Sequence, residues 1–275
     1  MRIVDLSVAI ENASESEEIP ARIKYISHRK GGTLLGLGVL WNGKSFFEKL
    51  FHFINGFVKR KRISSKDFPD SEALATEKIT LSTHTGTHID SPYHYGKNNR
   101  SIEEIPLDFF YSDGVMLDFS SRKSMEPLKK VEIIEKLDDI GYKLKPNDIV
   151  LICTGAYQYY GKREYKTDYF GLSVESLQFL LEKGIKLIGT DAFGLDQPFE
   201  YMERKFNQTK QKQYLWPTHL YGKKHPYMMI EKLSNLLKIG RFYNFKVAAF
   251  PIKIEGASAG WSRVVAIIYE EKESD

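Results

Sequence analysis

Hydrophobic residues in this chain gather in short runs that alternate between the spacing of strands and the spacing of helices. The runs that predict strands are Ile3–Val8, Lys78–Ser82, Gly114–Asp118, Asp148–Cys153, Lys186–Gly189, Phe245–Phe250 and Val264–Tyr269. Between them, Val131–Leu137 predicts a helix that ends near Gly141, and Ser173 is placed to cap a helix that runs to Leu181 and stops at Gly184. Alternating strands and helices are typical of an α/β fold.

A further helix is predicted from Ser45 to Val58, where the apolar residues fall on one broad face. The pattern is compatible with a core helix and with a lid over a site, and it does not decide between them. We find no linker that divides the chain, so we expect one domain over residues 1–275. Residues 28–70 and 200–216 are interpreted as insertions or lids, and Glu203–Gln213, which is polar, is expected to be an exposed loop or insertion.

Composition and charge narrow the class of protein. The chain has 275 residues, of which 42% are hydrophobic and 28% charged, as in ordinary globular proteins. Its net charge of +4 is too small to argue for nucleic acid. The basic run Lys59–Arg62 is compatible with a phosphate or membrane patch, but we interpret it as the solvated end of an amphipathic helix.

The single cysteine, Cys153, cannot form an intrachain disulfide, and no run of 18 apolar residues predicts a membrane span. We therefore expect a soluble, cytoplasmic protein. Its expected partner is a small-molecule substrate, and we expect neither nucleic acid nor a membrane as a partner.

The strongest chemical signal is the run His84-Thr-Gly-Thr-His88-Ile-Asp90-Ser-Pro-Tyr-His94, which holds three of the seven histidines. A helix is unfavourable here because Gly86 and Pro92 interrupt it. A straight strand would hold His84 and His88 roughly 13 Å apart, at about 3.3 Å per residue, which is too far for one shared ion. We therefore expect the backbone to turn, and Gly86 is the residue that allows it.

Two imidazoles and one carboxylate, with a coordination position left open, suit a catalytic Zn²⁺ or Mn²⁺ ion. A structural zinc site would be closed by thiolates, and the chain has only one cysteine. His94 has two possible roles. It is either a further ligand or a general acid/base beside the metal, since an imidazole titrates close to neutral pH, and its spacing alone does not decide.

These residues resemble the signature of the cyclase family, which includes bacterial kynurenine formamidase, isatin hydrolase, a dienelactone hydrolase and proteins named polyketide cyclases. Further segments that resemble family blocks, in the same order, are Asp5–Ser7, Thr190–Asp196, Ile230–Leu236 and Gly256–Arg263. The resemblance therefore spans essentially the whole chain. It implies an α/β single domain with a central β-barrel-like core flanked by helices, the swivelling β/α fold of the cyclases. It also implies a homodimer or a homotetramer.

The resemblance assigns one or two divalent metal ions to five residues, which are His84, His88, Asp90, His219 and Glu231. The aspartate of the formamidase branch bridges two ions, and His219 and Glu231 match the ligands of the second by their order and their separation of twelve residues. His225 is an alternative downstream ligand, and the alternative for Glu231 is a position on a helix surface. The histidine that matches His94 is the proposed proton donor and acceptor of the family.

For several other residues, a structural role is expected or is as compatible with the sequence as a functional one. We expect Asp191 and Asp196 to be structural, supporting a turn or a bond to a histidine. Arg263 is compatible with carboxylate binding and with a role in backbone packing. No feature near Cys153 indicates a lowered thiol pKa, so we do not expect a nucleophile there. The tyrosines of the segment 157–160 are compatible with a pocket lining and with core packing.

The leading hypothesis is a metal-dependent hydrolase that acts on an amide or on a cyclic lactone, lactam or imide through metal-activated water. His94 would pass a proton to the leaving group. One alternative is a polyketide-type cyclase or dehydratase that uses the same metal as a Lewis acid, and another is a non-catalytic metal-dependent binding protein. Residues Val8–Asn12 lack the aromatic and proline pattern of the formamidases, so the substrate is left open.

Overall fold

The computed structural model describes residues 1–41, 44–58 and 63–269. The basic run Lys59–Arg62 lies outside the described residues. Contacts between Cα atoms divide the chain into two compact units, one formed by Met1–Pro20 with Leu81–Asp275 and the other by Ala21–Thr80. Residues 28–70, which we interpret as an insertion or lid, fall inside the second unit.

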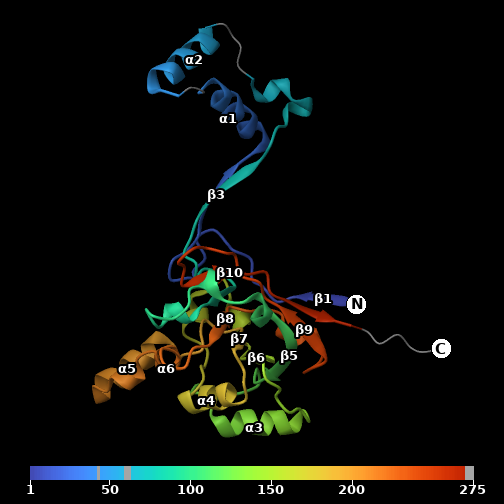
Figure 1. Cartoon of the computed structure of the whole chain (residues 1–275), viewed down its shortest axis with the longest axis vertical. Coiled ribbons are helices and arrows are strands. Elements are labelled where there is room, and N and C mark those ends of the chain that lie inside the picture. Colours follow the sequence, from blue (N-terminus) through green and yellow to red (C-terminus); the bar gives the residue numbers. More distant parts are fainter. Residues whose placement is uncertain (42–43, 59–62, 270–275) are drawn as a thin grey trace, which may run out of the picture. The chain divides into compact units, whose positions relative to one another are not determined.

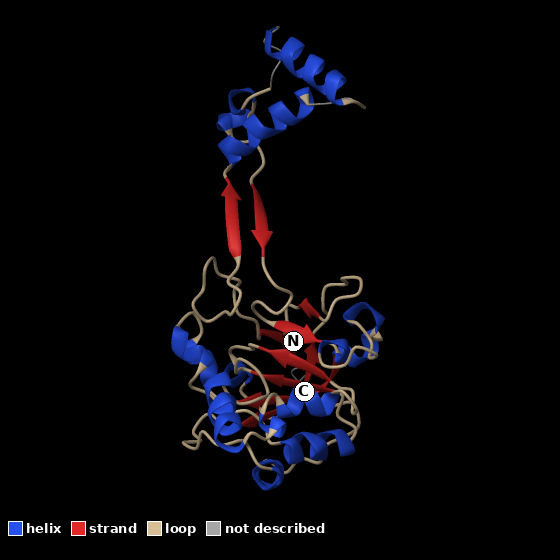
Figure 2. Cartoon of the chain, turned by 90° about the vertical axis from the view of Figure 1, so that its left-hand side faces the viewer, coloured by secondary structure: helices blue, strands red, loops and turns tan. Residues whose placement is uncertain are grey.

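The larger unit contains a mixed sheet, which has nine strands among the described residues, in the spatial order β1-β11-β9-β5-β6-β7-β8-β4-β10. Its strands are β1 Arg2–Asp5, β4 His88–Asp90, β5 Tyr111–Asp118, β6 Ile149–Cys153, β7 Leu187–Thr190, β8 Met228–Glu231, β9 Phe245–Ala248, β10 Ala259–Trp261 and β11 Val265–Ile268. Strands β5 to β8 are parallel, and the outer pairings are antiparallel. Figure 2 shows these strands side by side in the core. The sheet is a curled half-barrel flanked by helices, so the predicted fold class is confirmed.

The parallel strands are continuous apolar runs because both of their faces are covered. Helices α3 Lys130–Asp139 and α4 Val174–Glu182 connect β5 to β6 and β6 to β7, and they lie together below the sheet in Figure 1. Ile133 of α3 and Leu177 of α4 pack on one face of the sheet. Met116 and Leu151 belong to the core on the other face. Ser173 caps α4 by accepting a hydrogen bond from the backbone of Ser176, as predicted.

One prediction about this unit is wrong. The polar stretch Glu203–Gln213 is not a loop, because helix α5 spans Phe199–Thr209 and a 3-10 helix follows at Lys212–Tyr214. Phe199 and Met202 have helical spacing, and Met202 is buried. The Lys- and Gln-rich composition hid this short apolar face. Helix α6, Pro217–Gly222, comes next.

The smaller unit is built on an antiparallel pair of strands, β2 Arg22–Ile26 and β3 Thr76–Thr80. It also contains helices α1 His28–Leu40 and α2 Phe46–Val58, with 3-10 helices at Ser65–Asp67 and Pro69–Ser71 (Figure 1). Helix α2 matches the predicted helix. None of its side chains is buried, so it is not a core helix. Among the described residues, no helix combines the length and apolar character that crossing a membrane requires.

Candidate metal centre

Two neighbouring strands bring the first candidate ligands together. In the antiparallel pair of β4 and β8, His88 lies directly opposite Glu231. Because side chains two residues apart project from the same face of a strand, His88 and Asp90 point to one side while Ile89 enters the core. Both polar side chains are at most 1% exposed.

A tight turn before β4 returns His84 to the same place. Gly86 adopts a φ of +68°, which is the left-handed region that glycine occupies without strain. The turn brings the ring of His84 to 5.1 Å from the ring of His88, measured between centroids. The predicted turn at Gly86 is therefore confirmed. A Cβ atom at this position would also meet a side-chain carbon of Ile10 at 3.1 Å.

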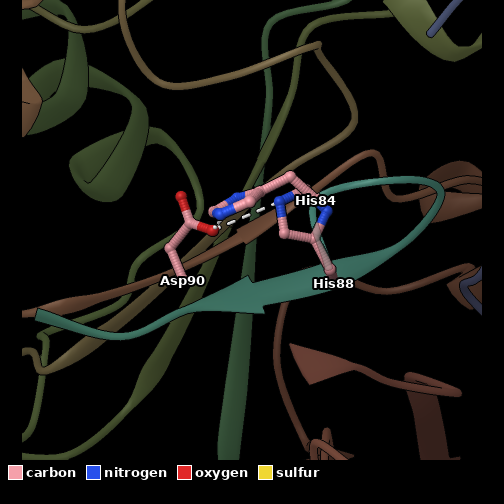
Figure 3. A group of neighbouring side chains, drawn as sticks. All are labelled: His84, His88 and Asp90. Carbon is pink, nitrogen blue, oxygen red and sulfur yellow. Dashed lines mark ion pairs between the residues drawn. The ribbon is translucent and has the colours of Figure 1, made fainter. Parts of the chain in front are cut away.

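The predicted ligands converge on two carboxylates. Nδ1 of His84 lies 2.8 Å from Oδ1 of Asp90, and Nε2 of His88 lies 3.2 Å from the same oxygen (Figure 3). Nε2 of His88 is also 3.3 Å from Oε2 of Glu231. Nε2 of His219 lies 3.9 Å from Oδ2 of Asp90 and 4.0 Å from Oε1 of Glu231. The structure thus brings together all five residues that the sequence analysis nominated.

Whether the site fits a metal ion can be judged from its buried atoms that lack a hydrogen-bond partner. They are Nε2 of His88 and both carboxylate oxygens of Asp90. Nδ1 of His88 lies 2.8 Å from the carbonyl oxygen of Gly86. A carbonyl only accepts, so in the neutral ring Nδ1 carries the proton and Nε2 has the lone pair that a metal ion would need. Buried polar atoms without partners are costly, and a divalent cation among them would satisfy them.

The donor set itself fits a divalent cation. Ligand atoms of His84, His88 and Asp90 all lie within 4.8 Å of one another, and those of Asp90, His94 and His219 do so as well. Neutral imidazoles and carboxylates are the ligands that Zn²⁺ and Mn²⁺ accept. The site therefore suits a divalent metal, as predicted, and its chemistry leaves the choice of ion open.

His219 is held in place by a carboxylate on its far side. Nδ1 of His219 donates to Oδ2 of Asp196 at 2.6 Å, and the backbone N–H groups of Thr218 and His219 donate to the same side chain. This arrangement turns Nε2 toward the cluster, which is the usual way in which a ligand histidine is oriented. The expected bond from Asp196 to a histidine is confirmed. His225 instead stacks on Tyr221, with ring centroids 4.3 Å apart.

His94 stands at the edge of the cluster, at the end of a 3-10 helix over Pro92–His94. Its ring centroid lies 4.3 Å from that of His84 and 5.4 Å from that of His219. Its Nε2 is 3.9 Å from Oδ2 of Asp90, and its side chain is 34% exposed, against 0% for His88. His94 is therefore the most accessible of the clustered histidines.

Charge dominates the titration of the buried groups. Burial acts to lower the pKa of His88, but the carboxylates of Asp90 and Glu231 outweigh it and raise that pKa to about 9. Burial and Asp196 oppose each other in the same way at His219, whose pKa is also raised to about 9. Burial acts to raise the pKa of Asp90, yet His84 and His88 hold it well below its usual range. These shifts show that the carboxylates of the site favour a positive charge beside them. Protons on the histidines supply that charge when no metal ion is bound.

The pKa of His94 moves the other way. Burial of the ring is the largest cause, and electrostatic repulsion from the neighbouring imidazoles of His84 and His219 adds to it, so the pKa falls below its ordinary value. Asp90 opposes this shift but does not reverse it. His94 is therefore neutral at pH 7.

A buried ion pair between Glu17 and Lys232 supports the turn at Gly86, and no pattern in the sequence predicted it. Oε1 of Glu17 accepts hydrogen bonds from the backbone N–H of Gly86 at 2.9 Å and from the hydroxyl of Tyr160 at 3.1 Å. Oε2 of Glu17 pairs with Nζ of Lys232, which also donates to the carbonyl oxygen of His84 at 2.8 Å. Glu17 is 4% exposed and Lys232 2%. The position of Lys232 next to Glu231 was the only signal available in the sequence.

Part of the cluster lines a cavity of about 510 Å³. His84, His94, His219 and Glu231 are among its polar lining residues. Large apolar side chains also form its wall, and they include Tyr169, Phe193, Phe199, Met202 and Trp216. The tyrosines of the segment 157–160 are not among the lining residues. Met202 and Trp216 are, and both belong to the segment 200–216 that we interpreted as an insertion or lid. The wall makes the cavity suitable for a flat, apolar group.

The remaining candidates lie outside the cavity. Asp191 accepts hydrogen bonds from the backbone N–H groups of Thr154 and Gly155, which confirms its structural role in the turn after β6. Cys153 is buried, and burial raises the pKa of its thiol, so it is not a nucleophile. Arg263 forms an ion pair with Asp5 at the surface, with an N–O distance of 2.6 Å.

Comparison with known proteins places the chain in a family. A family model described as "Putative cyclase" matches residues 4–197, which is more than two thirds of the chain. The chain belongs to this cyclase family. The expected resemblance is thereby confirmed, and the histidine motif lies within the matched residues.

Curated relatives of this chain include kynurenine formamidases. The enzyme of Erythrobacter litoralis is 24% identical over 189 residues, which cover 68% of this chain and 74% of the relative. The enzyme of Bacillus thuringiensis subsp. konkukian is 30% identical over 128 residues, which cover 46% of this chain and 56% of the relative. The match thus spans little more than half of the Bacillus protein.

Solved structures show the same fold. An isatin hydrolase bound to the product analogue thioisatinate aligns with a TM-score of 0.71 and 17% identity, over 98% of this chain and 93% of the other. Isatin hydrolase A from Labrenzia aggregata aligns with a TM-score of 0.68 and 22% identity, over 98% and 94%. The predicted class of a metal-dependent hydrolase agrees with these relatives and with the histidine and aspartate cluster of this chain.

Proposed function

We propose that this protein hydrolyses the C–N or C–O bond of an amide or of a cyclic lactone, lactam or imide with one or two bound Zn²⁺ or Mn²⁺ ions. The observation that carries the proposal is the buried carboxylate of Asp90. Its two oxygens have no hydrogen-bond partner, and four histidines surround it, three of which line the cavity.

The two oxygens of Asp90 face different ligand groups, which supports a site for two ions. Oδ1 faces His84 and His88 at 2.8 and 3.2 Å. Oδ2 faces His94 and His219 at 3.9 Å each. We propose that His84, His88 and Asp90 hold one ion and that Asp90, His219 and Glu231 hold the other.

A bound divalent ion supplies Lewis acidity, which makes water a nucleophile at neutral pH and polarises a carbonyl group. We propose that His94 moves the proton. Its neutral ring accepts a proton at Nε2 and passes it to the nitrogen or oxygen that leaves. His94 suits this task because its side chain is exposed to the cavity, whereas His88 is fully buried.

The cavity wall indicates which substrates to try. Tyr169, Phe193 and Trp216 offer aromatic surfaces in the same cavity that the polar cluster lines. Such a wall favours a substrate whose scissile carbonyl is attached to a flat ring, because stacking on aromatic side chains excludes water from the bond. The relatives are named as a formamidase and as hydrolases of isatin, which fits a carbonyl substrate of this kind.

The test begins with purified protein loaded in turn with Zn²⁺ and Mn²⁺, whose metal content is measured by elemental analysis. A panel of N-formylanilines, isatins, aromatic lactones and cyclic imides is then assayed in ¹⁸O-labelled water. We expect turnover of at least one class with label in the product. Ring closure with expulsion of water would instead support the alternative of a cyclase or dehydratase. Metal-loaded protein that turns over no member of the panel would contradict a hydrolase.

A further inference from the structure

Helix α2 in the smaller unit carries an apolar stripe that no side chain of the described residues buries. Phe47, Phe51, Ile54 and Val58 recur at intervals of three and four residues, so they form one line along the helix. They are 80%, 66%, 52% and 76% exposed. Isolated exposed apolar residues are common, but a continuous stripe of this kind indicates a binding surface.

The opposite side of α2 is already occupied. Trp41 packs edge-on against Phe53, with ring centroids 5.7 Å apart. Gly56 lies so close to Leu40 that a Cβ atom added at Gly56 would come within 2.3 Å of a side-chain carbon of Leu40. These contacts join α2 to the end of α1, so within this unit the stripe points away from the contact with α1. Leu34 and Leu35 of α1 and the ring of Trp41 are also 43–45% exposed.

The net charge of residues 21–80 indicates which kind of partner suits the stripe. Residues 21–80 carry twelve Lys and Arg against five Asp and Glu, a net charge of +7, whereas the whole chain is +4. The remaining residues are therefore net negative. The basic residues lie on both sides of the apolar helices in the sequence, with four between residues 22 and 30 and four more between residues 59 and 62. A second copy of the same unit would meet this surface with like charge, which disfavours it.

We propose that α2 binds the surface of a membrane rich in anionic lipids, with its stripe inserted at the level of the head groups. Surface helices of this kind have aromatic residues on the apolar face, as α2 does, and they are common in segments whose sequence is basic, as residues 21–80 are. The Lys and Arg residues add attraction to anionic head groups that falls off within a Debye length. This binding needs no spanning helix. It revises our expectation that a membrane is not a partner, and it does not depend on the proposed function.

The test uses the full chain and sedimentation with large vesicles. One set contains phosphatidylcholine alone, and the other contains about a quarter phosphatidylserine. We expect at least about tenfold tighter binding to the anionic set, and release as the salt concentration rises. The double variant Phe47→Ser, Phe51→Ser should lose binding by about tenfold or more, because it removes two inserted rings.

A matched control separates this effect from a general loss of apolar surface. The variant Leu107→Ser, Val131→Ser removes two residues of the larger unit that are 65% and 53% exposed, and it should bind vesicles like the parent. Circular dichroism and thermal unfolding establish that each variant is folded. Equal binding to both vesicle sets, or undiminished binding of the α2 variant, would overturn the proposal. So would an absence of vesicle binding together with a dimer that the α2 variant dissociates, since the stripe would then be an interface between copies.

Discussion

His88 and Glu231 are 143 positions apart in the chain, yet they lie directly opposite each other on antiparallel strands, with Nε2 of His88 3.3 Å from Oε2 of Glu231. Strand positions are held by the backbone hydrogen bonds of the sheet, so this pair is placed more rigidly than residues on loops. The register of β4 and β8 thus determines whether the site exists at all. A shift of β4 by one residue would send His88 to the other face and leave Glu231 without it.

Replacing Glu231 by glutamine should weaken metal binding. The amide keeps the size of the side chain but removes the negative charge that faces His88 and His219, so we expect about a tenfold or greater loss of affinity for the more weakly held ion. Titration of metal-free protein with Mn²⁺, followed by calorimetry, measures it. Glu203→Gln on the exposed side of α5 is the matched control. Unchanged stoichiometry and affinity in Glu231→Gln would remove Glu231 from the ligand set.

Replacing His94 by alanine tests the division between ligand and proton carrier. We expect the variant to keep its full metal content and to lose about 10²- to 10⁴-fold in kcat, the usual contribution of a general acid/base. Elemental analysis and steady-state kinetics are measured on the same sample. His225→Ala, whose ring stacks on Tyr221 outside the cluster, should change neither quantity. A metal-free His94→Ala protein would show that His94 is a ligand.

The pH dependence of kcat/KM should report the lowered pKa of His94. Burial and the neighbouring histidines disfavour the protonated ring, so the neutral form persists below pH 6.5. A bound cation would favour the neutral form further. We therefore expect activity to fall only when the pH drops below the ordinary histidine value, at saturating metal. His94→Ala should lack this limb in its residual activity, whereas a limb centred above pH 6.5 would contradict the assignment.

Asp196 should act on the metal through His219. Changing Asp196 to alanine frees the ring of His219 to rotate, since Nδ1 loses its 2.6 Å partner. We expect a loss of about 10- to 100-fold in metal affinity. Asp196→Glu, which retains a carboxylate, should recover part of it. The measurement is metal affinity by competition with a chelator, and an unchanged value in Asp196→Ala would show that Asp196 serves only the backbone of α6.

Local patterns predicted the parts of the site that a few residues determine. The motif from His84 to His94 lies within one short run, and the need for a turn at Gly86 follows from chain geometry alone. His219 was reached only through the resemblance to a family, because its place depends on the packing of α6. The role of Lys232 was missed because its partner lies 215 residues away, and only the folded sheet brings the two together. Helix α5 was missed because its apolar face is short.

The buried pair of Glu17 and Lys232 should be essential to stability in a way that surface pairs are not. Lys232→Met leaves the carboxylate of Glu17 buried without its cation, and we expect a loss of about 3–5 kcal/mol in the free energy of unfolding. Lys145→Met breaks the exposed pair with Asp113 and should cost about 1 kcal/mol or less. Urea unfolding of metal-free protein measures both, so that loss of metal does not contribute.

The double variant Glu17→Gln, Lys232→Met completes this test. Because it removes both charges, we expect it to be more stable than Lys232→Met alone. It should still hold metal less tightly than the parent, since the carbonyl oxygen of His84 loses the Lys232 ammonium that fixes it. Glutamine retains an acceptor for the backbone N–H of Gly86, so part of the support for the turn remains. A double variant as unstable as Lys232→Met would show that the cost comes from lost packing and not from an unpaired charge.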